Sequence, residues 1–320
     1  MSKKRKNLVY TLITLVLIFL AVHFLGVLVR PANMDIAVDS AAAFHDMPEN
    51  SIDVLCMGSS HMWRGYDPVT AYRKYGIASY NFGCYYQKIN TTLLFLQDAF
   101  RTQSPKVVVI DTFYCNRLKS DDTFDGELYS TKKISFSADK LRYLHDCFGN
   151  DFEKYLNYFV PLTAFHGNWV SLFEKDIGSD ISDIDLRDTF GFASSDRTVP
   201  SRLPDSTETE QRSLTPDAET VLRQIVTLCR KNGAAPVFIT IPYEEAFAYS
   251  DAMTTFAECN GCAYLDLFQY IEKIGLDAET DFSDASHLNS SGADKIASFI
   301  GKYLSEHFSL TDRRTAGSIQ

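Results

Sequence analysis

The sequence predicts an α/β protein in which helices cover both faces of a doubly wound parallel sheet. Short apolar runs of strand length recur along the chain, and amphipathic helical patterns alternate with them. The central run at 105–113 is almost continuously apolar, which is typical of a strand buried on both faces of a parallel sheet. Alternation of strand and helix then implies three layers, with the sheet in the middle.

Five strands are predicted. The run at 51–58, Ser-Ile-Asp-Val-Leu-Cys-Met-Gly, is apolar and is ended by glycine, and the run at 78–83 repeats this pattern in shorter form. Each strand is followed by turn residues or polar side chains. The predicted strands are 51–58, 78–83, 105–113, 236–241 and 263–268.

Three helices are predicted to pack on this sheet. The first covers about 89–102, where leucines and a phenylalanine share one side. The second begins with Thr-Pro at 215–216, since threonine is a good N-cap and proline suits the first helical position, and Gly233 ends it. The last is expected to begin at Ser290 or Ser291 as its cap.

The N-terminus is expected to anchor the chain in a membrane. Residues 8–29 are apolar with four interruptions, and roughly 20 such residues cross a bilayer as a helix. The basic tail at 1–7 should stay in the cytoplasm, which puts the domain at 51–320 outside the cell, after a connector at 30–50 with a short helical piece. The alternative, a cleaved signal peptide, would have a shorter apolar region and a small-residue cleavage site.

Charge excludes one class of partner. Residues 1–30 carry five basic groups and no acid, so the remainder has 26 basic against 41 acidic side chains, a net charge of −15. An acidic domain repels phosphate backbones, so nucleic acid is not expected as a partner, and tight docking on anionic lipid is disfavoured as well.

The seven cysteines do not indicate a metal site. Cys259 and Cys262 form a lone C-x-x-C pair, whereas zinc needs three or four ligands. A local disulfide or two unpaired thiols are the alternatives for this pair. No metal and no organic cofactor is expected.

The region 115–214 differs from the rest of the chain. It is rich in Asp, Ser, Tyr and Phe and lacks long periodic patterns, and it is too long for a simple loop in a compact domain. We predict an inserted, partly helical lid. Within it, His166 and Trp169 are candidates for contact with a sugar ring, although a tryptophan of an amphipathic helix is more often part of the core.

Polar clusters follow the predicted strands at the edge where ligands bind in such sheets. Ser60 and His61 come directly after the first strand, Gly83 ends the second, and Asp111 ends the third with Asn116 just beyond. A serine at a strand-to-helix turn can present its hydroxyl outward beside free backbone N–H groups. His61 is expected either to cap the following helix or to contact substrate, as Asp111 could.

A further polar cluster precedes the last helix and completes a possible nucleophilic site. Asp284 and His287 stand three residues apart, so in a turn the carboxylate can reach the imidazole and fix its tautomer. The other imidazole nitrogen could then take the proton of Ser60, which is a weak nucleophile without a base. Ser59 is the alternative nucleophile.

These residues resemble blocks I, II and V of the SGNH/GDSL hydrolases: Gly58-x-Ser60, Gly83 and Asp284-x-x-His287. The resemblance implies a flavodoxin-like fold, with Ser60 as nucleophile, His287 as base, Asp284 as its orienting group and the Ser60 and Gly83 amides in the oxyanion hole. It is nearest to membrane-anchored bacterial members that include the teichoic-acid D-alanine transfer protein and exopolysaccharide O-acetyltransferases.

The chain departs from the family in two places. Ser59 stands where the family has aspartate, and no Gly-x-Asn-Asp block follows the third strand. That block supplies an asparagine to the oxyanion hole, so Asn116 or Thr112 would have to replace it. Loss of one such donor can cost ~100- to 1,000-fold in rate.

The resemblance implies an extracellular serine esterase or O-acyltransferase that acts on a cell-surface glycan or cell-wall polymer. A multispanning membrane O-acyltransferase is implied as the partner that delivers the acyl group. Two alternatives stay open. The domain could be a non-catalytic glycan-binding subunit of a polysaccharide assembly, or it could be a general esterase.

Overall fold

A computed structural model describes residues 2–29, 33–119, 126–167, 184–204, 210–245 and 247–314. Its centre is a five-stranded parallel sheet with the strand order β2-β1-β3-β4-β5. This is a doubly wound order. The chain adds β2 on one side of β1 and then β3, β4 and β5 on the other, so the strand order switches between β1 and β3. The strands are β1 (Val54–Met57), β2 (Ser79–Asn81), β3 (Val107–Asp111), β4 (Ala235–Thr240) and β5 (Ala263–Asp266).

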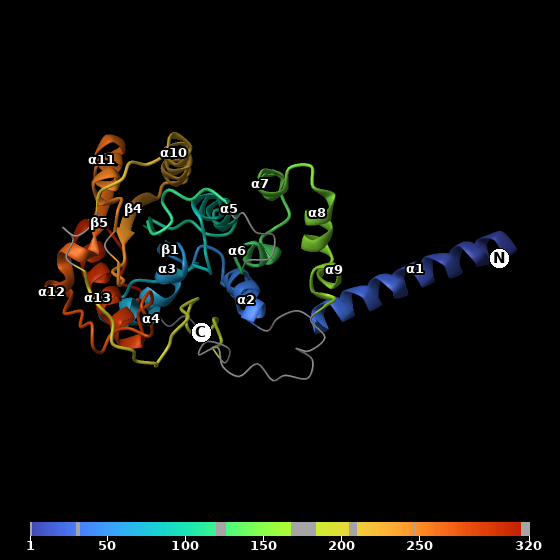
Figure 1. The fold of residues 1–320 in the computed structure, drawn as a ribbon, viewed down its shortest axis with the longest axis horizontal. Coiled ribbons are helices and arrows are strands. Elements are labelled where there is room, and N and C mark those ends of the chain that lie inside the picture. Colours follow the sequence, from blue (N-terminus) through green and yellow to red (C-terminus); the bar gives the residue numbers. More distant parts are fainter. Residues whose placement is uncertain are drawn as a thin grey trace.

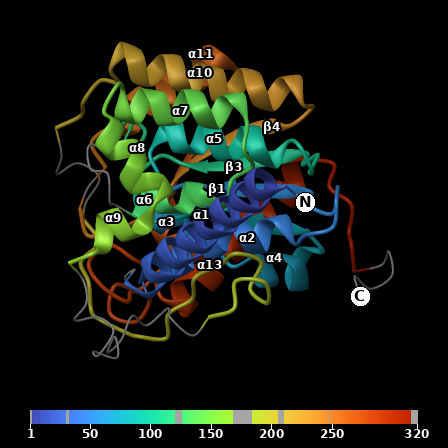
Figure 2. The same ribbon diagram turned by 90° about the vertical axis from the view of Figure 1, so that its right-hand side faces the viewer.

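Helices cover both faces of the sheet, as Figures 1 and 2 show. On one face, buried side chains of the sheet pack with those of α2 (Asn33–His45), α5 (Ile89–Ala99), α10 (Pro216–Lys231) and α11 (Ser250–Asn260). On the other face they pack with α3 (Ser60–Gly65), α4 (Pro68–Tyr75), α12 (Ile271–Ile274) and α13 (Ser290–His307). The predicted three-layer α/β class is therefore confirmed.

The predicted helices begin for the expected reasons, with one correction. Thr215 caps α10, since its side chain accepts the Ala218 N–H at 3.3 Å, and Pro216 is the first helical residue. The cap of α13 is Asn289, whose Oδ1 accepts the Gly292 N–H at 3.1 Å, so the expected cap at Ser290 or Ser291 was one or two residues late. An asparagine side chain satisfies a free N–H as well as serine does.

The region 115–214 contains α6 to α9 in its described part. These helices pack outside α2 and α5, and their buried side chains extend the core on that face. Residues 192–204 instead lie along α3 and the loop before α13: the Ala193 N–H donates to Trp63 O, and the Val199 N–H donates to Phe282 O. The helices are α6 (Gly126–Ser130), the 3₁₀ turn η1 (Thr131–Lys133), α7 (Ala138–Phe148), α8 (Phe152–Phe159) and α9 (Pro161–Phe165).

The N-terminal helix α1 (Lys3–Leu28) projects away from the domain in Figure 1. Its 26 residues give a length of about 39 Å at 1.5 Å per residue, and its most apolar window has a mean hydropathy of 2.6. Among the described residues it is the one helix long and apolar enough to span a membrane. The connector contains the full helix α2, whose Phe44 ring stacks on Phe82 with centroids 4.2 Å apart.

Candidate active site

The turn between β1 and α3 is built for close approach of the backbone. Gly58 has φ +153°, and a Cβ there would lie 2.5 Å from the Asp111 Cβ, so only glycine fits. Ser59 caps the short helix α3 by accepting the His61 N–H at 3.3 Å. Ser60 is the first residue of α3 and is half-buried, whereas Ser59 is only 1% exposed. The turn therefore presents the Ser60 hydroxyl and buries that of Ser59.

Ser60, His287 and Asp284 form one chain of hydrogen bonds. The Ser60 Oγ lies 2.8 Å from His287 Nε2, and His287 Nδ1 lies 2.8 Å from Asp284 Oδ1 and 3.0 Å from its Oδ2. Because the carboxylate only accepts, Nδ1 carries the proton and Nε2 is left to accept the Ser60 proton. The three side chains come from opposite ends of the domain sequence, and the structure brings them together at the carboxyl edge of the sheet.

The loop before α13 holds the carboxylate in place. Asp284 Oδ1 accepts the N–H groups of Ser286, at 2.8 Å, and of His287, at 3.0 Å. Burial opposes its ionisation, but the hydrogen bond and charge of His287, the Ser286 N–H and the charge of Arg64 outweigh this and hold the pKa of Asp284 well below its usual range. The group is therefore a carboxylate at neutral pH.

Arg64 of α3 supports this loop, and sequence reasoning missed it. Its guanidinium donates to Ser283 Oγ at 3.0 Å and lies 3.5 Å from Asp284 Oδ2. The Arg64 side chain is largely buried, but that of Asp284 is 43% exposed, so solvent screens part of the attraction between their charges. Nothing within a few residues of position 64 signals a partner 220 residues away.

His61 lies behind the base rather than in open solvent. Its ring stacks on Phe113 with centroids 3.7 Å apart and lies 5.4 Å from the His287 ring. Burial and the neighbouring His287 charge hold the pKa of His61 well below its usual value, so the imidazole is neutral. At 4% exposure it supports the site from within, and we do not assign it the substrate contact considered from the sequence.

Asp111 likewise lies beneath the turn. It accepts the Ser59 hydroxyl proton at 3.0 Å and the Phe113 N–H at 3.3 Å. Burial raises the pKa of this carboxyl to about 7, against the lowering effect of these hydrogen bonds. Ser59 thus joins the end of β3 to the cap of α3.

Gly83 and Asn116, which were considered for the oxyanion hole, make different hydrogen bonds. The Gly83 N–H donates to Asn81 Oδ1 at 3.3 Å, and the Asn81 amide binds the carbonyls of Met62 and Tyr66 in α3 and just after it. Asn116 instead donates to Tyr249 Oη and accepts the Thr215 N–H at 2.7 Å. These bonds tie Asn116 to the start of α10, and we do not assign it to the oxyanion hole.

A cleft of about 510 Å³ opens beside the His287 loop. Phe113 and Tyr243 form an aromatic wall, with ring centroids 5.1 Å apart. The Glu244 N–H donates to Ala285 O at 3.0 Å, which joins the segment after β4 to the loop between Asp284 and His287. The cleft is lined by Phe113, Arg202, Tyr243, Glu244, Glu245, Ala285 and Ser286, so it is largely polar.

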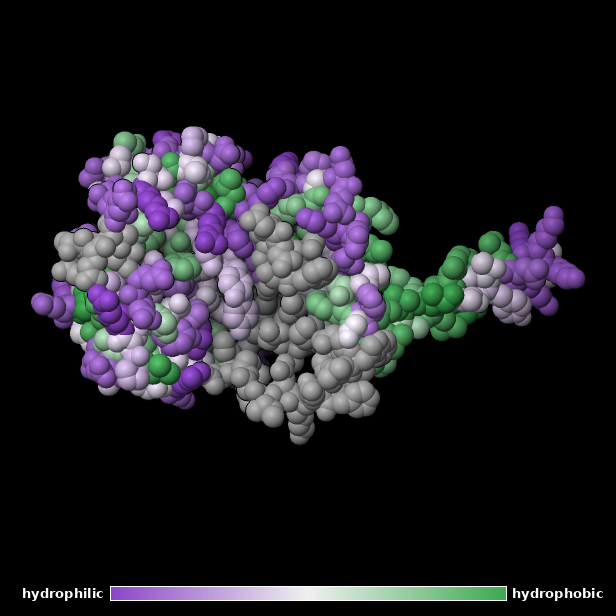
Figure 3. Space-filling view, viewed as in Figure 1, coloured by the Kyte–Doolittle hydropathy of each residue, from purple (hydrophilic) through white to green (hydrophobic). Residues whose placement is uncertain are grey.

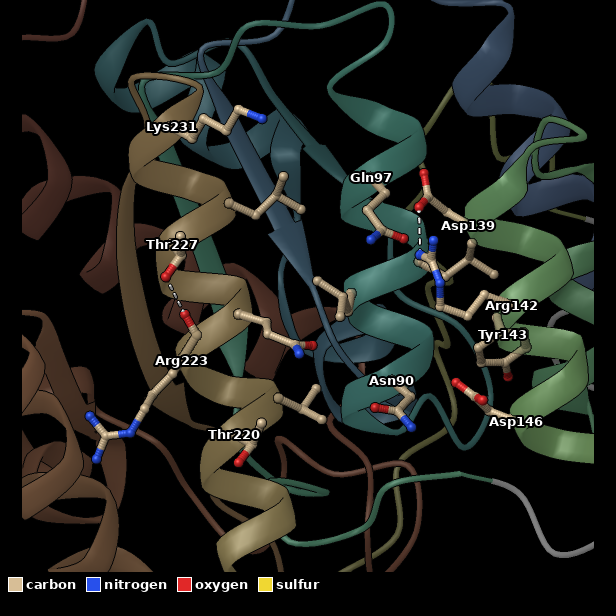
Figure 4. Close-up of a pocket in the computed structure, with 15 residues that line it drawn as sticks. Asn90, Gln97, Asp139, Arg142, Tyr143, Asp146, Thr220, Arg223, Thr227 and Lys231 are labelled. Carbon is tan, nitrogen blue, oxygen red and sulfur yellow. Dashed lines mark hydrogen bonds and ion pairs between the residues drawn. The ribbon is translucent and has the colours of Figure 1, made fainter.

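A larger groove of about 860 Å³ lies elsewhere, between α5, α7 and α10 (Figure 4). Leu93, Val221 and Leu228 contribute apolar side chains to it, and charged groups such as Arg142 and Arg223 stand around it. Ser60, Asp284 and His287 line neither this groove nor the 510 Å³ cleft, but Ala285 and Ser286 of the His287 loop line the cleft. The volume of a pocket therefore does not identify the site, whereas the hydrogen bonds that join Ser60, His287 and Asp284 do.

Of the two candidates from the predicted lid, the structure describes only His166, and it lies away from the site. His166 is exposed at the end of α9, where its Nδ1 lies 2.9 Å from Thr163 O, and Figure 1 places α9 beside α1 and well apart from α3. Trp169 lies outside the described residues. Within the described ranges, no group of three or more His, Cys, Asp or Glu side chains could hold a metal ion.

Comparisons with known proteins find distant matches among solved structures. No protein-family model matches the chain, and no curated protein matches it. Among solved structures, a "putative acylhydrolase" from Bacteroides fragilis is similar with a TM-score of 0.39 and 11% sequence identity. The match covers 83% of this chain and 94% of the other.

Proposed function

We propose that this protein is a serine acyl-ester enzyme of the SGNH type, an esterase or O-acyltransferase that works through an acyl-Ser60 intermediate. The observation that carries the proposal is the chain of hydrogen bonds from Ser60 through His287 to Asp284. Such a chain gives a weak hydroxyl nucleophile the base that it needs. The nucleophile also stands at a strand-to-helix turn on the sheet edge where doubly wound folds place their ligands.

The geometry supports a two-step reaction. Ser60 Oγ attacks the acyl carbonyl while His287 Nε2 takes its proton, and Asp284 stabilises the resulting imidazolium. The Ser60 N–H holds the tetrahedral oxyanion, and the Gly83 N–H joins it by releasing its bond to Asn81 Oδ1. His287 then returns the proton to the leaving alcohol as the C–O bond breaks. In the second step His287 deprotonates a sugar hydroxyl or a water, which attacks the acyl-Ser60 ester and frees the serine.

We propose a cell-surface glycan or cell-wall polymer as the acylated or accepting substrate. The cleft beside the His287 loop offers an aromatic wall, two carboxylates and an arginine, a combination suited to a hydroxyl-rich ring. The helix α1 would anchor the enzyme with the domain outside, and a multispanning membrane acyltransferase would deliver the acyl group. A C-terminal reporter that works only outside the cytoplasm should be active; an inactive reporter would contradict this topology.

One observation favours a second function, a non-catalytic glycan-binding subunit. The segment after β3 offers no side-chain amide to the site. There Thr112 Oγ1 lies 2.6 Å from Thr240 Oγ1, and Phe113 stacks on His61. An oxyanion hole with only backbone donors would be weaker than that of the family.

Labelling with a fluorophosphonate probe separates the two functions. The full chain in detergent should be labelled, the Ser60→Ala variant should not be, and Ser59→Ala should keep its labelling because that hydroxyl is buried. Absence of labelling in all three, or equal labelling of Ser60→Ala, would favour the binding subunit. Turnover of p-nitrophenyl acetate with and without added glycan then distinguishes transfer from hydrolysis, since only transfer forms an acylated glycan.

A further inference from the structure

Apolar side chains are exposed in an uneven way on this molecule. In the described part of the chain outside α1, six large hydrophobic residues are exposed. Five of them lie between residues 136 and 159. Exposed apolar patches of this kind mark surfaces that contact another molecule or a membrane. The six are Tyr86, Phe136, Leu141, Phe152, Leu156 and Phe159.

Three of these side chains form a stripe on α8. Phe152, Leu156 and Phe159 recur at helical spacing and are 75%, 37% and 52% exposed. The opposite side of the helix is packed: Tyr158 is buried, its Oη lies 2.8 Å from Thr131 Oγ1, and its ring contacts Phe148 of α7. The side of α8 that carries Tyr158 therefore packs against the core, and the exposed stripe is a second apolar face of the helix.

The next helix fixes α8 to the end of α1. Gly26 of α1 is buried against α9, where a Cβ at position 26 would lie 2.8 Å from the Leu162 N and 3.3 Å from the Pro161 Cβ. Only Val160 separates α8 from α9. In Figures 1 and 2, α8 lies on the side of the domain from which α1 projects, and it runs across the direction of α1 in Figure 1. Figure 3 shows apolar side chains along this edge of the domain, next to those of α1.

The position of α8 identifies what would cover the stripe. If α1 crosses a bilayer, the surface of that bilayer lies where α1 meets α9, at the level of α8. An amphipathic helix that lies flat in a membrane interface buries Phe and Leu side chains among the lipid chains. The three side chains of the stripe carry no charge, so they can insert into the membrane without attraction to anionic lipid. Such attraction is not expected, because the domain is acidic.

We propose that α8 is an interfacial membrane helix whose Phe152, Leu156 and Phe159 insert into the outer leaflet of the bilayer that α1 crosses. The inference rests on the proposed membrane anchorage. Together, α1 and α8 hold the domain against the membrane in one orientation, so that the cleft beside His287 keeps a fixed position relative to the bilayer surface.

Quenching by brominated lipids tests this inference on the full chain in phosphatidylcholine proteoliposomes. A tryptophan is added as Phe152→Trp on α8, Phe19→Trp within α1, or Tyr270→Trp next to α12 at the far end of the domain. Quenching beyond that of the unmodified chain is measured, because Trp63 and Trp169 are native. Phe152→Trp should be quenched, most strongly by bromine near the head group, Phe19→Trp by deep bromine, and Tyr270→Trp by neither.

The outcomes separate the inference from its premise. A second variant on α8, Phe159→Trp, is measured as well. If Phe19→Trp is quenched but both α8 variants are as little quenched as Tyr270→Trp, the interfacial helix is overturned and the membrane anchor stands. In that case the stripe would be free for a membrane-embedded protein partner. Failure of Phe19→Trp to be quenched would overturn the anchorage itself, and the inference with it.

Discussion

Asp284 has two tasks in the loop before α13. Its Oδ1 accepts two backbone N–H groups of the loop, and both of its oxygens lie within 3.0 Å of the His287 imidazole. Asp284→Asn would present an N–H to Nδ1 and favour the tautomer whose Nε2 carries the proton. We expect kcat for p-nitrophenyl acetate to fall about 10³- to 10⁴-fold, as in serine proteases. An unchanged kcat with an unchanged thermal transition would mean that His287 is not the base.

Arg64 is a positioning residue, because it contacts Asp284 and Ser283 rather than the reacting atoms. Arg64→Gln should lower kcat by roughly 10- to 100-fold through misplacement of the carboxylate, with a small effect on KM. Arg64→Lys should restore part of the loss. Arg142→Gln, at an exposed arginine of α7, is the matched control and should leave kcat unchanged. A change in KM alone would contradict the positioning role.

The Asp111 carboxyl should make stability depend on pH. Burial raises its pKa from 3.8 to about 7 in the folded protein, so the folded state holds a proton that the unfolded chain releases between about pH 4 and 7. The free energy of unfolding should therefore decrease as pH rises through this window, by on the order of 3 kcal/mol. Asp111→Asn should remove that decrease in denaturant titrations of the full chain in detergent. Equal pH profiles would show that Asp111 is ionised in the fold.

The sequence indicated which site residues stand after strands, but not how their side chains are used. Ser60 stands at the carboxyl end of β1, and the loop before α13 brings Asp284 and His287 to the same edge of the sheet. The side-chain partners of Asn116, His61 and Arg64 are set by packing between distant segments. Thus Asn116 bonds Thr215 and Tyr249, and His61 lies behind Phe113, for reasons that no local pattern reveals.

Among the elements, the start of α13 has the most direct bearing on the site. Asn289 caps this helix and also donates to Thr280 O at 2.8 Å, so it closes the loop that carries Asp284 and His287. Asn289→Ala should destabilise the protein by about 1 to 2 kcal/mol in denaturant titrations. Ser305→Ala, at an exposed position in the same helix, is the control and should change stability little. An equally small effect of both would contradict the capping role.

The predicted elements were those whose pattern is local. All five strands were expected, since apolar runs bounded by glycine or polar residues are visible in the sequence, and their observed bounds are mostly shorter. The helix α3 was expected only as a helix after Ser60, without bounds, and α4 was not predicted. Their six and eight residues are too few for a clear period, and most of α3 is buried, so it lacks a polar face.

For the whole molecule, alternation of strand and helix was enough to predict three layers. The place of the region 115–214 was not predictable, because it depends on contacts between segments far apart in sequence. Its described helices α6 and α7 pack on α2 and α5, while Arg202 alone of its described residues lines the 510 Å³ cleft. Whether that region acts as a lid, and where the domain boundaries lie, stay predictions.

The account depends above all on a covalent acyl-Ser60 intermediate. The most direct measurement is mass spectrometry of the full chain, quenched in acid shortly after mixing with p-nitrophenyl acetate. We expect the mass of one acetyl group on the intact protein and its localisation to Ser60 after proteolysis. Ser59→Ala should behave in the same way, and Ser60→Ala should carry no acetyl group. An acetyl group on Ser59, or one that persists in Ser60→Ala, would contradict the account.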